Sequence, residues 1–398
     1  MQSGIKKLIL AGGGHAHVHV LSQLAEQRPA DLDVILASPY PWQTYSGMVP
    51  GFVAGRYEAH ECQIPLEPLV KAAGARWLPG RVTGIDAQSQ AVRVETGPAH
   101  SPEEHALYYD RLSLDIGGVM ERDRLEQTIP GAASHALLVR PIEVFATLWP
   151  KVVELGQEKP VSLAVIGAGA AGIELVFAAE QRFRQTLHPG SRFTLVTGGG
   201  EVAEHYPAGV RKRILRRLRS RGITVLREAC TAISAGQIQL SGGASLACDA
   251  PVLAVPTHAP GWLRETDLAL TDNGLVQVNE FQQSVSHPNI FAVGDVSHRV
   301  DVQHPRSGVF AVRAGPPLHQ NLMAAHEGTP LKAYQPQKHS LNLISCGAGH
   351  AIASYGPFHA EGGWAWLWKD HIDRAFMERY TLEKHLPPEP AEQGGEES

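Results

Sequence analysis

The residues best suited to chemistry lie in two glycine-rich turns, each set between an apolar run and a helical pattern. Residues 12–17 read GGGHAH, and residues 167–172 read GAGAAG, about 155 residues later. In such a turn the first glycine makes the tight bend, the second lets the backbone approach a diphosphate, and the third lets helix pack on strand. The following helix presents free N–H groups and a positive dipole end to the phosphates. Two such turns predict two dinucleotide sites, which suggests one carrier reducing another.

Each turn needs a strand before it and a helix and a second strand after it. Around the first turn we expect strands at residues 5–10 and 33–37, with a helix between them that runs through Leu21 and Leu24. Around the second turn we expect a strand at 161–166, a helix at 173–183 and a strand at 193–196. Both phrases are βαβ units, so the chain is predicted to be an α/β protein of the doubly wound, dinucleotide-binding kind.

Further strands are expected on either side of the second unit. Residues 77–94 and 109–118 are predicted to return to the first sheet, and residues 289–295 form a strand that ends in Gly294 and Asp295. After the second unit we expect strands at 223–226, 237–240 and 251–255. A last, mainly β module is predicted from apolar runs at 339–345, 351–355 and 364–368. Residues 386–398 are rich in Pro, Gly and Glu and are predicted to be disordered.

Composition limits the remaining choices. A chain of 398 residues with 43% hydrophobic residues can hold two to three domains. Its formal net charge of −5 argues against a nucleic-acid-binding protein. No apolar run resembles a secretory signal or a membrane span, because residues 162–179 are interrupted by glycines and Glu174, so we expect a cytoplasmic protein. The four cysteines are widely spaced, which excludes a disulfide scaffold and a CxxC-type zinc site.

At this point the chain resembles a known family. The order of motifs is similar to that of the two-dinucleotide flavoproteins of the pyridine nucleotide-disulfide oxidoreductase superfamily, in the branch of type II NADH dehydrogenases and sulfide:quinone reductases. It is most similar to the flavoprotein module that is sometimes fused to selenophosphate synthetase. The resemblance covers about residues 5–380, and it is carried by residues 12–20, 39–51, 109–110, 294–295, 305–313 and 368–377.

The resemblance implies a fold and two bound nucleotides. It implies two Rossmann-like domains, one for FAD and one for NAD(P)H, the second inserted in the first, plus a small C-terminal α+β module. The expected bounds are 1–118 with 264–330 for the FAD domain, 119–263 for the NAD(P) domain, 331–385 for a C-terminal interface module and 386–398 for the tail.

The resemblance also assigns residues to each nucleotide. The expected FAD contacts are Gly12, Gly14, His15, Ala16, Ser38, Ser46, Gly47, Val82, Gly117, Gly294, Asp295, Gly308 and Val309. Among these, Asp295 is expected to hydrogen-bond the sugar or ribityl chain. Gly308 is expected to open a helix whose N-terminus favours negative charge on the reduced flavin ring. The expected NAD(P)H contacts are Gly167, Gly169, Ala170, Gly172 and Thr197, with Glu174 near the nicotinamide.

Four positions depart from the family pattern, one of them the segment 255–257, which reads Val-Pro-Thr where Ala-Thr-Gly is usual. The third glycine of the first turn is His17, which predicts looser packing of helix on strand. Ser38 stands where an acidic ribose ligand is expected, and a hydroxyl still forms hydrogen bonds. Thr197 stands at the corresponding position of the second unit, where it is neither the acidic residue of an NAD site nor next to an arginine for a 2′-phosphate. These departures make FAD binding the firmer of the two expectations.

Cysteine and histidine chemistry leaves alternatives open. Cys346 resembles one of the two flavin-flanking cysteines of a sulfide:quinone reductase, but no cysteine lies between 63 and 229, where the other is expected; an inert buried thiol is the alternative. His15, His17 and His19 alternate, yet on a helix only His15 and His19 share a face, so no metal site is predicted. For His15 we weigh a contact with the cofactor against simple packing at the helix start.

Two surface features raise the question of a membrane. Residues 210–219 predict an amphipathic helix with a basic outer face, which is either an ordinary surface helix or attracted to anionic lipid. Trp364, Trp366 and Trp368 alternate as on a strand, ahead of a helix expected at 369–380, and they suit either core or dimer packing or a membrane-interface platform with a quinone entrance. Any attachment is expected to be peripheral, on the inner membrane face.

Three functions follow for testing. The first is an FAD-dependent NAD(P)H dehydrogenase that passes electrons to a quinone or a similar small-molecule acceptor. The second is flavin-dependent oxidation of a sulfide or selenide compound with help from Cys346. The third is a flavin-binding accessory protein of selenium metabolism with a decayed NAD(P) site, whose partner is selenophosphate synthetase by analogy with the fused proteins. Glu174 and Cys346 are the catalytic candidates.

Overall fold

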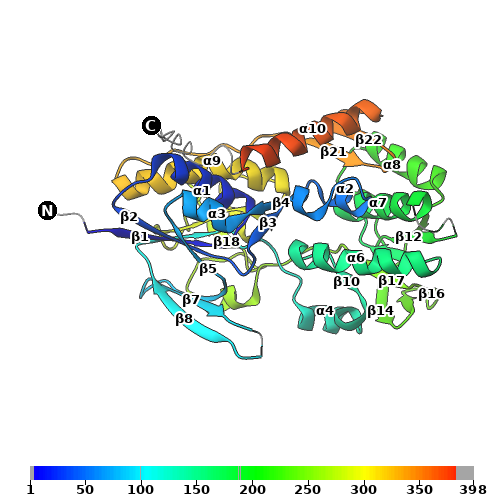
Figure 1. Ribbon diagram of the computed structural model, residues 1–398, viewed down its shortest axis with the longest axis horizontal. Helices are drawn as coiled ribbons and strands as arrows, with labels where there is room; N and C mark the ends of the chain where they lie inside the picture. The colour runs from blue at the N-terminus through cyan, green and yellow to red at the C-terminus, as the bar shows by residue number, and fades with distance from the viewer. Residues whose placement is uncertain (1–3, 99, 187, 189, 382–398) are drawn as a thin grey trace, which may run out of the picture.

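The computed structural model describes residues 4–98, 100–186, 188 and 190–381. The predicted tail at 386–398 lies outside the described residues. Two five-stranded parallel sheets organise the rest, one in each half of the molecule (Figure 1). Both predicted βαβ units are confirmed, because each glycine turn joins a strand to a helix and the next strand pairs in parallel with the first.

The first sheet has the strand order β19-β9-β1-β2-β5. Its strands are β1 (Lys6–Ala11), β2 (Leu32–Ala37), β5 (Arg76–Leu78), β9 (Arg111–Leu114) and β19 (Ile290–Ala292). One face packs against α1 (His15–Gln27), α3 (Leu66–Ala72) and α9 (Gly308–Glu327) through a core that includes Leu10, Leu21 and Leu318. Since β19 comes from a segment about 175 residues after β9, this sheet is built from two stretches of chain that are far apart in the sequence.

The other face of the first sheet is covered by a separate antiparallel sheet. This sheet contains β6 (Gly80–Asp86), β7 (Ala91–Thr96) and β8 (Glu103–Tyr108). The prediction that residues 77–94 return to the first sheet is therefore correct for β5 and wrong for β6 and β7. The alternating residues Val82, Val92 and Val94 point into the shared core, so they form a second layer of the half and do not extend its first sheet.

The second sheet is built from one continuous stretch of chain, in the order β10-β17-β11-β12-β13. Its strands are β10 (Leu137–Leu138), β11 (Ser162–Ile166), β12 (Arg192–Val196), β13 (Thr224–Leu226) and β17 (Ala250–Leu253). Its covering helices are α6 (Ile142–Glu158), α7 (Ala170–Thr186) and α8 (Ala208–Ser220), and beside it lie α4 (Arg122–Thr128), α5 (Ala132–His135) and the small sheet of β14 (Cys230–Ser234), β15 (Gln237–Leu240) and β16 (Ser245–Ala247).

A C-terminal module packs across both halves. It consists of β21 (Leu341–Ser345), β22 (Ala351–Tyr355), β23 (Phe358–Gly362) and α10 (Gly363–Arg379), and Figure 1 shows α10 running along the top of the molecule. The prediction of a strand at 364–368 is wrong, because Trp364, Trp366 and Trp368 lie in the first turns of α10. Trp364 and Trp368 are four residues apart, which also places them on one face of a helix. The tryptophan spacing therefore fits both a strand and a helix.

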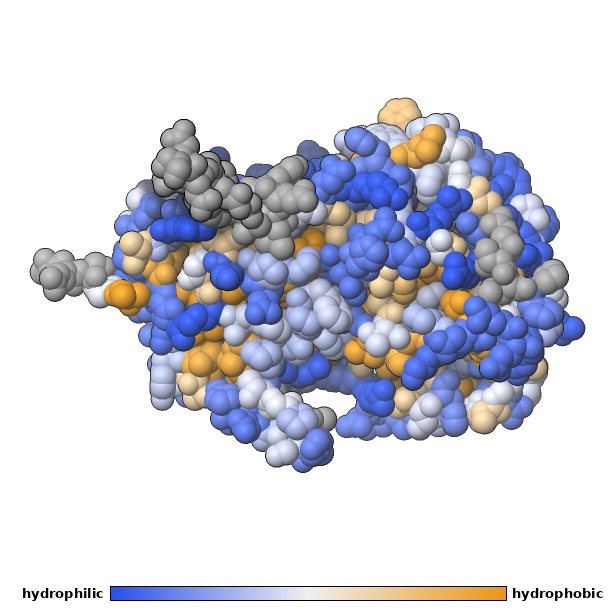
Figure 2. All heavy atoms as spheres, in the orientation of Figure 1, coloured by the Kyte–Doolittle hydropathy of each residue, from blue (hydrophilic) through white to orange (hydrophobic). Residues whose placement is uncertain are grey.

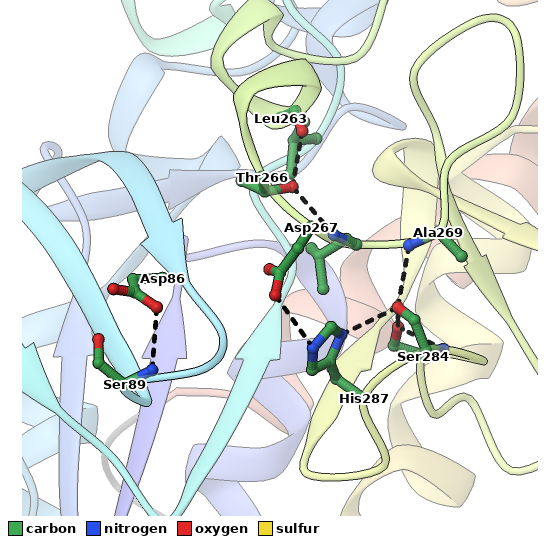
Figure 3. Close-up of polar contacts among 10 residues, drawn as sticks. Asp86, Ser89, Leu263, Thr266, Asp267, Ala269, Ser284 and His287 are labelled. Atoms are coloured by element: carbon green, nitrogen blue, oxygen red, sulfur yellow. Dashed lines mark hydrogen bonds and ion pairs between the residues drawn. The ribbon is translucent and has the colours of Figure 1, made fainter.

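Short elements connect these parts. They are β3 (Trp42–Thr44), α2 (Val49–Val53), η1 (Ala59–Cys62), β4 (Gln63–Pro65), η2 (Gly261–Glu265), β18 (Val276–Val278), η3 (Gly294–Val296) and β20 (Ser297–Arg299). The return segment before β19 is tied down by polar contacts (Figure 3). Asp267 pairs with His287 Nε2 at 3.3 Å, and His287 Nδ1 lies 2.9 Å from the Ser286 hydroxyl. That hydroxyl also accepts a hydrogen bond from the Ala269 amide, so the Asp-His-Ser chain holds a loop in place.

Candidate functional site

A cavity of about 530 Å³ opens at the carboxyl ends of β1 and β9, between the two halves. This volume falls within the roughly 300–1,000 Å³ of ordinary ligand sites. Its wall brings together ten of the residues that the sequence predicts for FAD: Gly12, Gly14, His15, Ser38, Ser46, Val82, Gly117, Gly294, Asp295 and Gly308. The predicted contacts Ala16, Gly47 and Val309 do not line it. The ten come from separate stretches of the chain, so the cavity exists only in the folded protein.

The first glycine turn requires glycine at two positions. Gly12 has a φ of 91°, and a Cβ there would lie 2.4 Å from the Asp115 carbonyl oxygen. A Cβ at Gly14 would lie 2.3 Å from the Asp115 carboxyl carbon. The turn therefore holds the backbone close to β9 and leaves its amides at the mouth of the cavity, ahead of the positive end of α1. An anionic diphosphate fits this amide-lined wall.

Asp115 is a site residue that the sequence analysis missed. It follows β9 directly, lines the cavity, and is only 4% exposed. Its Oδ2 accepts hydrogen bonds from the amides of Ala16 at 2.8 Å and His17 at 3.1 Å. Burial and, to a smaller extent, nearby Asp295 raise the pKa of Asp115 to about 7, against the two amide hydrogen bonds. An acidic residue at the carboxyl end of a parallel strand, inside an apolar run, was the signal available in the sequence.

His17 fills the space beside the turn where a third glycine is usual. Its Nδ1 lies 2.6 Å from the Gly12 carbonyl oxygen and therefore donates a hydrogen bond, while its Nε2 accepts one from the Ser113 hydroxyl at 2.8 Å. The side chain is fully buried, and burial lowers its pKa to about 4 despite the Gly12 hydrogen bond, so the imidazole is neutral at pH 7. His17 thus links the glycine turn to β9 and fixes both.

His15 connects the cavity to the C-terminal helix. Its ring meets Tyr45 edge-on at 5.7 Å between centroids and Phe376 at 6.1 Å, and its Nε2 accepts a hydrogen bond from the Gln43 side chain at 3.3 Å. Burial, with help from Arg140, lowers the pKa of His15 to about 4. His15 lines the cavity wall as a neutral group, and its predicted contact with the cofactor stays a prediction.

Arg140 is a second cavity residue that the sequence analysis missed. It lies just before α6, and its guanidinium is 3.8 Å from the Asp295 carboxylate. Glu143, also in the wall, accepts a hydrogen bond from the Thr44 amide at 3.2 Å. These contacts join α6 of the second half to η3 and β3 of the first. No motif places Arg140 near Asp295 in the sequence, because the two are 155 residues apart.

The helix α9 starts at the cavity as the resemblance implies. Gly308, its first residue, and Ala311 belong to the wall. A Cβ at Gly308 would lie 3.0 Å from the Ser46 hydroxyl, so glycine allows the loop at residues 45–48 to approach the helix N-terminus. That loop is held from the other side by Lys369 of α10, whose ammonium donates to the Gly47 carbonyl and pairs with Asp373, both at 2.7 Å.

The second glycine turn has the geometry of a nucleotide-binding turn but lies outside the large cavity. A Cβ at Gly172 would lie 1.9 Å from the Gly167 carbonyl oxygen, whereas a Cβ at Gly169 would meet no atom within 4 Å. Gly169 therefore faces open space where a diphosphate can approach. The hydroxyl of Thr197, after β12, donates to the Gly200 carbonyl at 2.8 Å.

Glu174 lies on α7 and points toward the C-terminal module. Its carboxylate accepts a hydrogen bond from the Ser345 amide at 2.8 Å. Burial raises the pKa of Glu174, while Lys369 and the Ser345 hydrogen bond oppose this. The residue does not line the large cavity, so its predicted place near the nicotinamide stays a prediction.

Cys346 is fully buried in the core that α7 shares with the C-terminal module. Its thiol donates to the Ile344 carbonyl, and burial together with Glu174 raises its pKa well above the usual range for a thiol. All four cysteines are buried and unpaired. The predicted redox role of Cys346 therefore has little physical support, because the reactive form of cysteine is the thiolate.

The remaining polar clusters are not arranged for metal binding. Among the described residues no group of three or more His, Cys, Asp or Glu side chains is placed to hold a metal ion. Of the alternating histidines, His17 is engaged with Gly12 and Ser113, and His19 Nδ1 lies 3.3 Å from the Tyr380 hydroxyl. The Asp-His-Ser chain of Figure 3 also lies outside the cavity wall.

Comparison with known proteins gives relatives over most of the chain. It is 27% identical over 314 residues to the NADH dehydrogenase-like protein Rv1812c of Mycobacterium tuberculosis, covering 76% of this chain and 73% of that protein. It is 24% identical over 368 residues to the demethylphylloquinone reductase NdbB of Synechocystis, covering 88% of each.

Solved structures share the fold. The sulfide:quinone oxidoreductase of Aquifex aeolicus superposes with a TM-score of 0.75 at 17% identity, covering 94% of this chain and 91% of the other. The NDH2 of Plasmodium falciparum in complex with NADH superposes with a TM-score of 0.73 at 13% identity, covering 96% and 98%.

The family model for pyridine nucleotide-disulphide oxidoreductases matches residues 6–323, which include both glycine turns, the cavity wall and the start of α9. The matched segment contains the glycine turn at the large cavity and the second turn, where Gly169 borders open space. The chain belongs to the pyridine nucleotide-disulphide oxidoreductase family and is an oxidoreductase that uses FAD and NAD(P)H.

Proposed function

We propose that this protein is an FAD-dependent NAD(P)H dehydrogenase that delivers electrons to a quinone. The observation that supports it best is the single cavity in which Gly14, Asp295 and Gly308 meet, because an amide-lined turn, a carboxylate and a helix N-terminus suit the diphosphate, sugar and ring of FAD. When bound, FAD supplies the redox chemistry by accepting hydride from NAD(P)H and passing electrons on. The quinone is proposed by analogy with the demethylphylloquinone reductase relative.

The residues of this chain position the reactants. The α1 amides and the α9 N-terminus place positive potential at the two ends of the cavity, where the diphosphate and the reduced ring need it. Lys369 holds the Gly47 loop against the C-terminal module, so the loop that would border the flavin ring is fixed before any substrate arrives. Neutral His15 packs against Tyr45 and leaves no charge of its own at that end of the cavity. Proximity of the two carriers accounts for most of the expected rate.

The nicotinamide is proposed to approach from the second turn. Gly167, Gly169, Ala170 and Gly172 would bind its diphosphate, Thr197 would lie near the adenosine ribose, and Glu174 near the nicotinamide. In support, Gly169 borders open space and Glu174 is held in one orientation by the Ser345 amide. Replacing Glu174 by Gln keeps a hydrogen-bond acceptor for Ser345 and removes the charge. We expect the KM for NADH to rise with little change in melting temperature.

The function is tested by anaerobic titration of the purified holoenzyme. NADH, NADPH and sulfide are added separately while the flavin absorbance is recorded, and a soluble quinone is then added. We expect bleaching by NADH or NADPH and recovery of colour with quinone. NADH binding without bleaching would contradict the proposal and would favour the accessory-protein alternative with a decayed nucleotide site.

Bleaching by sulfide alone would favour the second alternative, oxidation of a sulfide or selenide compound. The burial of Cys346 counts against that reaction, since it needs a thiolate at the flavin. A selenophosphate synthetase partner is supported only by the resemblance to the fused proteins. Affinity capture of that enzyme by the tagged full chain tests it, with a tagged unrelated flavoprotein as the control.

We also propose peripheral attachment to a membrane through the C-terminal module. The outer face of α10 exposes Trp364, Leu367, Trp368 and Ile372, which recur at helical spacing, and Phe358 beside it is 75% exposed. Figure 2 shows apolar atoms on the upper rim of the molecule, over this module. The basic helix α8 adjoins it, because Arg213 and Arg216 pair with Glu361 of β23. An apolar face beside a cationic one suits an anionic lipid surface.

No helix among the described residues is long and apolar enough to cross a membrane, so any attachment through them is superficial. Sedimentation with vesicles tests it. We expect binding to vesicles that contain phosphatidylglycerol, weaker binding to pure phosphatidylcholine, and loss of binding in Leu367→Glu. Val300→Glu, which places the same charge at an exposed apolar position away from the module, is the matched control. Equal binding of both variants would contradict the assignment.

A further inference from the structure

The cavity wall contains a carboxyl group in an unusual position for an anion site. Asp115 accepts hydrogen bonds from the amides of the second and third residues of α1, which belong to the same helix N-terminus that a diphosphate needs. Its carboxylate is packed tightly, since a Cβ at Gly14 would overlap its carboxyl carbon and a Cβ at Gly294 would lie 3.1 Å from its Oδ1. The carboxyl group of Asp115 therefore lies directly against the backbone of both glycines, and its two amide hydrogen bonds hold it at the turn.

The charges around Asp115 do not compensate for a second anion. From η3, Asp295 contributes another carboxylate to the same wall. From α1, His15 and His17 are neutral at pH 7, because burial lowers the pKa of each to about 4. Among the arginines of the wall, Arg81, Arg122 and Arg140, no salt bridge is formed with Asp115, and Arg140, before α6, faces Asp295 at 3.8 Å. A bound diphosphate would add its negative charges to this group at low dielectric, where like charges repel strongly.

We propose that Asp115 takes up a proton when FAD binds and remains a neutral carboxylic acid in the holoenzyme. This inference rests on the proposed FAD site. The neutral acid keeps the property that the fold needs, because its carbonyl oxygen still accepts from the Ala16 and His17 amides. It also removes a negative charge from beside the diphosphate. Asp115 is thus a positioning residue whose protonation is part of cofactor binding.

The consequence for pH has a definite sign. In the free protein the pKa of Asp115 is raised to about 7 by burial and by Asp295, and the added diphosphate raises it further. Below pH 7 the acid is already protonated, so binding needs no proton and the affinity for FAD is independent of pH. Above pH 7 each binding event must take up a proton, so the dissociation constant rises by about tenfold per pH unit.

The test uses the full-chain holoenzyme. It is diluted to equilibrium at pH values from 6 to 9, and free FAD is measured by its fluorescence. We expect a constant dissociation constant up to about pH 7 and a rise of about tenfold per unit beyond it, for one proton. Asp115→Asn, which keeps the acceptor oxygen and removes the titration, is expected to change less than twofold over the same range. Asp110→Asn, an exposed residue at the opposite end of β9 that accepts from the Lys7 amide, is expected to keep the wild-type slope.

A second readout needs no variant to fold. The infrared spectrum of the wild-type holoenzyme at pH 8 is expected to contain the carbonyl band of a buried protonated carboxylic acid, which disappears on release of FAD. A wild-type dissociation constant that does not change from pH 6 to 9, or an unchanged slope in Asp115→Asn, would overturn the inference. Failure to hold FAD even at pH 6 would instead reject the proposed flavin site, so the two failures are distinguishable.

Discussion

Two side chains against the first glycine turn have opposite effects on its chemistry. His17 satisfies two buried polar groups, since its imidazole donates a hydrogen bond to the Gly12 carbonyl and accepts one from the Ser113 hydroxyl. Asp115 has the opposite effect, since its carboxyl group occupies a backbone amide that would otherwise favour a bound anion. Both side chains are buried, so water neither hydrogen-bonds the imidazole nor screens the carboxyl group. At the residue scale, His17 therefore stabilises the glycine turn by filling the space beside it, whereas a charged Asp115 disfavours a bound anion.

His17→Gly would place glycine at the third position of the usual GxGxxG spacing and test whether the histidine is structural. We expect the free energy of unfolding to fall by about 2–4 kcal/mol, because a large buried side chain and two hydrogen bonds are lost. Urea unfolding of the holoenzyme measures this. His19→Gly, two positions along the same helix and less buried, serves as the control for adding glycine to α1. A variant as stable as the wild type would show that His17 merely occupies available space.

Cys346→Ala tests the remaining thiol candidate. Because Cys346 is protonated and enclosed by the core, we expect turnover with NADH and quinone within twofold of the wild type and a stability loss of about 1 kcal/mol. Steady-state kinetics and thermal unfolding check the two parts. Cys248→Ala, buried in a different core, gives the loss expected of any such truncation. A hundredfold loss of turnover in Cys346→Ala alone would return the thiol to the mechanism.

At the scale of elements, each glycine turn joins a strand to a helix, and backbone atoms make the closest contacts in the turn. In the second turn, Gly172 touches the Gly167 carbonyl, while Gly169 touches nothing in the described protein within 4 Å of a Cβ. Glycine at 172 therefore allows close packing inside the protein, whereas glycine at 169 leaves space for a ligand. The distinction makes a substitution possible that affects binding without affecting the fold.

Gly169→Ala is expected to raise the KM for NADH at least tenfold and to leave the bound FAD and the melting temperature unchanged. The added methyl enters the space that a diphosphate needs and meets no protein atom. Gly190→Ala, in the turn before β12, adds a methyl at ordinary contact distance from Pro160 and is the control. Unaltered NADH kinetics in Gly169→Ala would place the nucleotide elsewhere.

The elements that the sequence predicts correctly are those whose pattern is local. Glycine spacing and an apolar strand specify both βαβ units, and ten of the cavity residues follow from them and from the family resemblance. The first turns of α10, before Lys369, were assigned wrongly, because Trp364 and Trp368 fit both periods and Gly362 and Gly363 resemble a turn. Asp115 and Arg140 were missed because their roles arise from contacts across about 100 and 155 residues of chain. Such contacts depend on tertiary packing, which local pattern does not encode.

At the scale of the whole molecule, the two halves differ in how they are assembled. The second sheet, with β10 to β13 and β17, comes from one continuous segment, whereas the first sheet needs β19 and α9 from beyond it. Arg140 with Asp295 and Glu143 with Thr44 then join the halves at the cavity. The cavity therefore depends on segments of the chain that lie on both sides of the second sheet in the sequence.

The predicted domain bounds give a direct test of this difference. We expect residues 119–263, expressed alone, to unfold cooperatively in urea, because they contain the complete second sheet. Residues 1–118 alone are expected to remain largely unfolded and to bind no FAD, because β19 and α9 are missing. Circular dichroism and flavin fluorescence measure both. A stable, FAD-binding 1–118 fragment would contradict the discontinuous arrangement.

The burial of all four cysteines has a practical consequence. A maleimide dye should find no reactive sulfur on the native protein, so the wild type forms a silent background for site-directed labelling. One cysteine introduced on the outer face of α10 would then carry a single fluorophore, whose colour and anisotropy report what surrounds that helix during turnover.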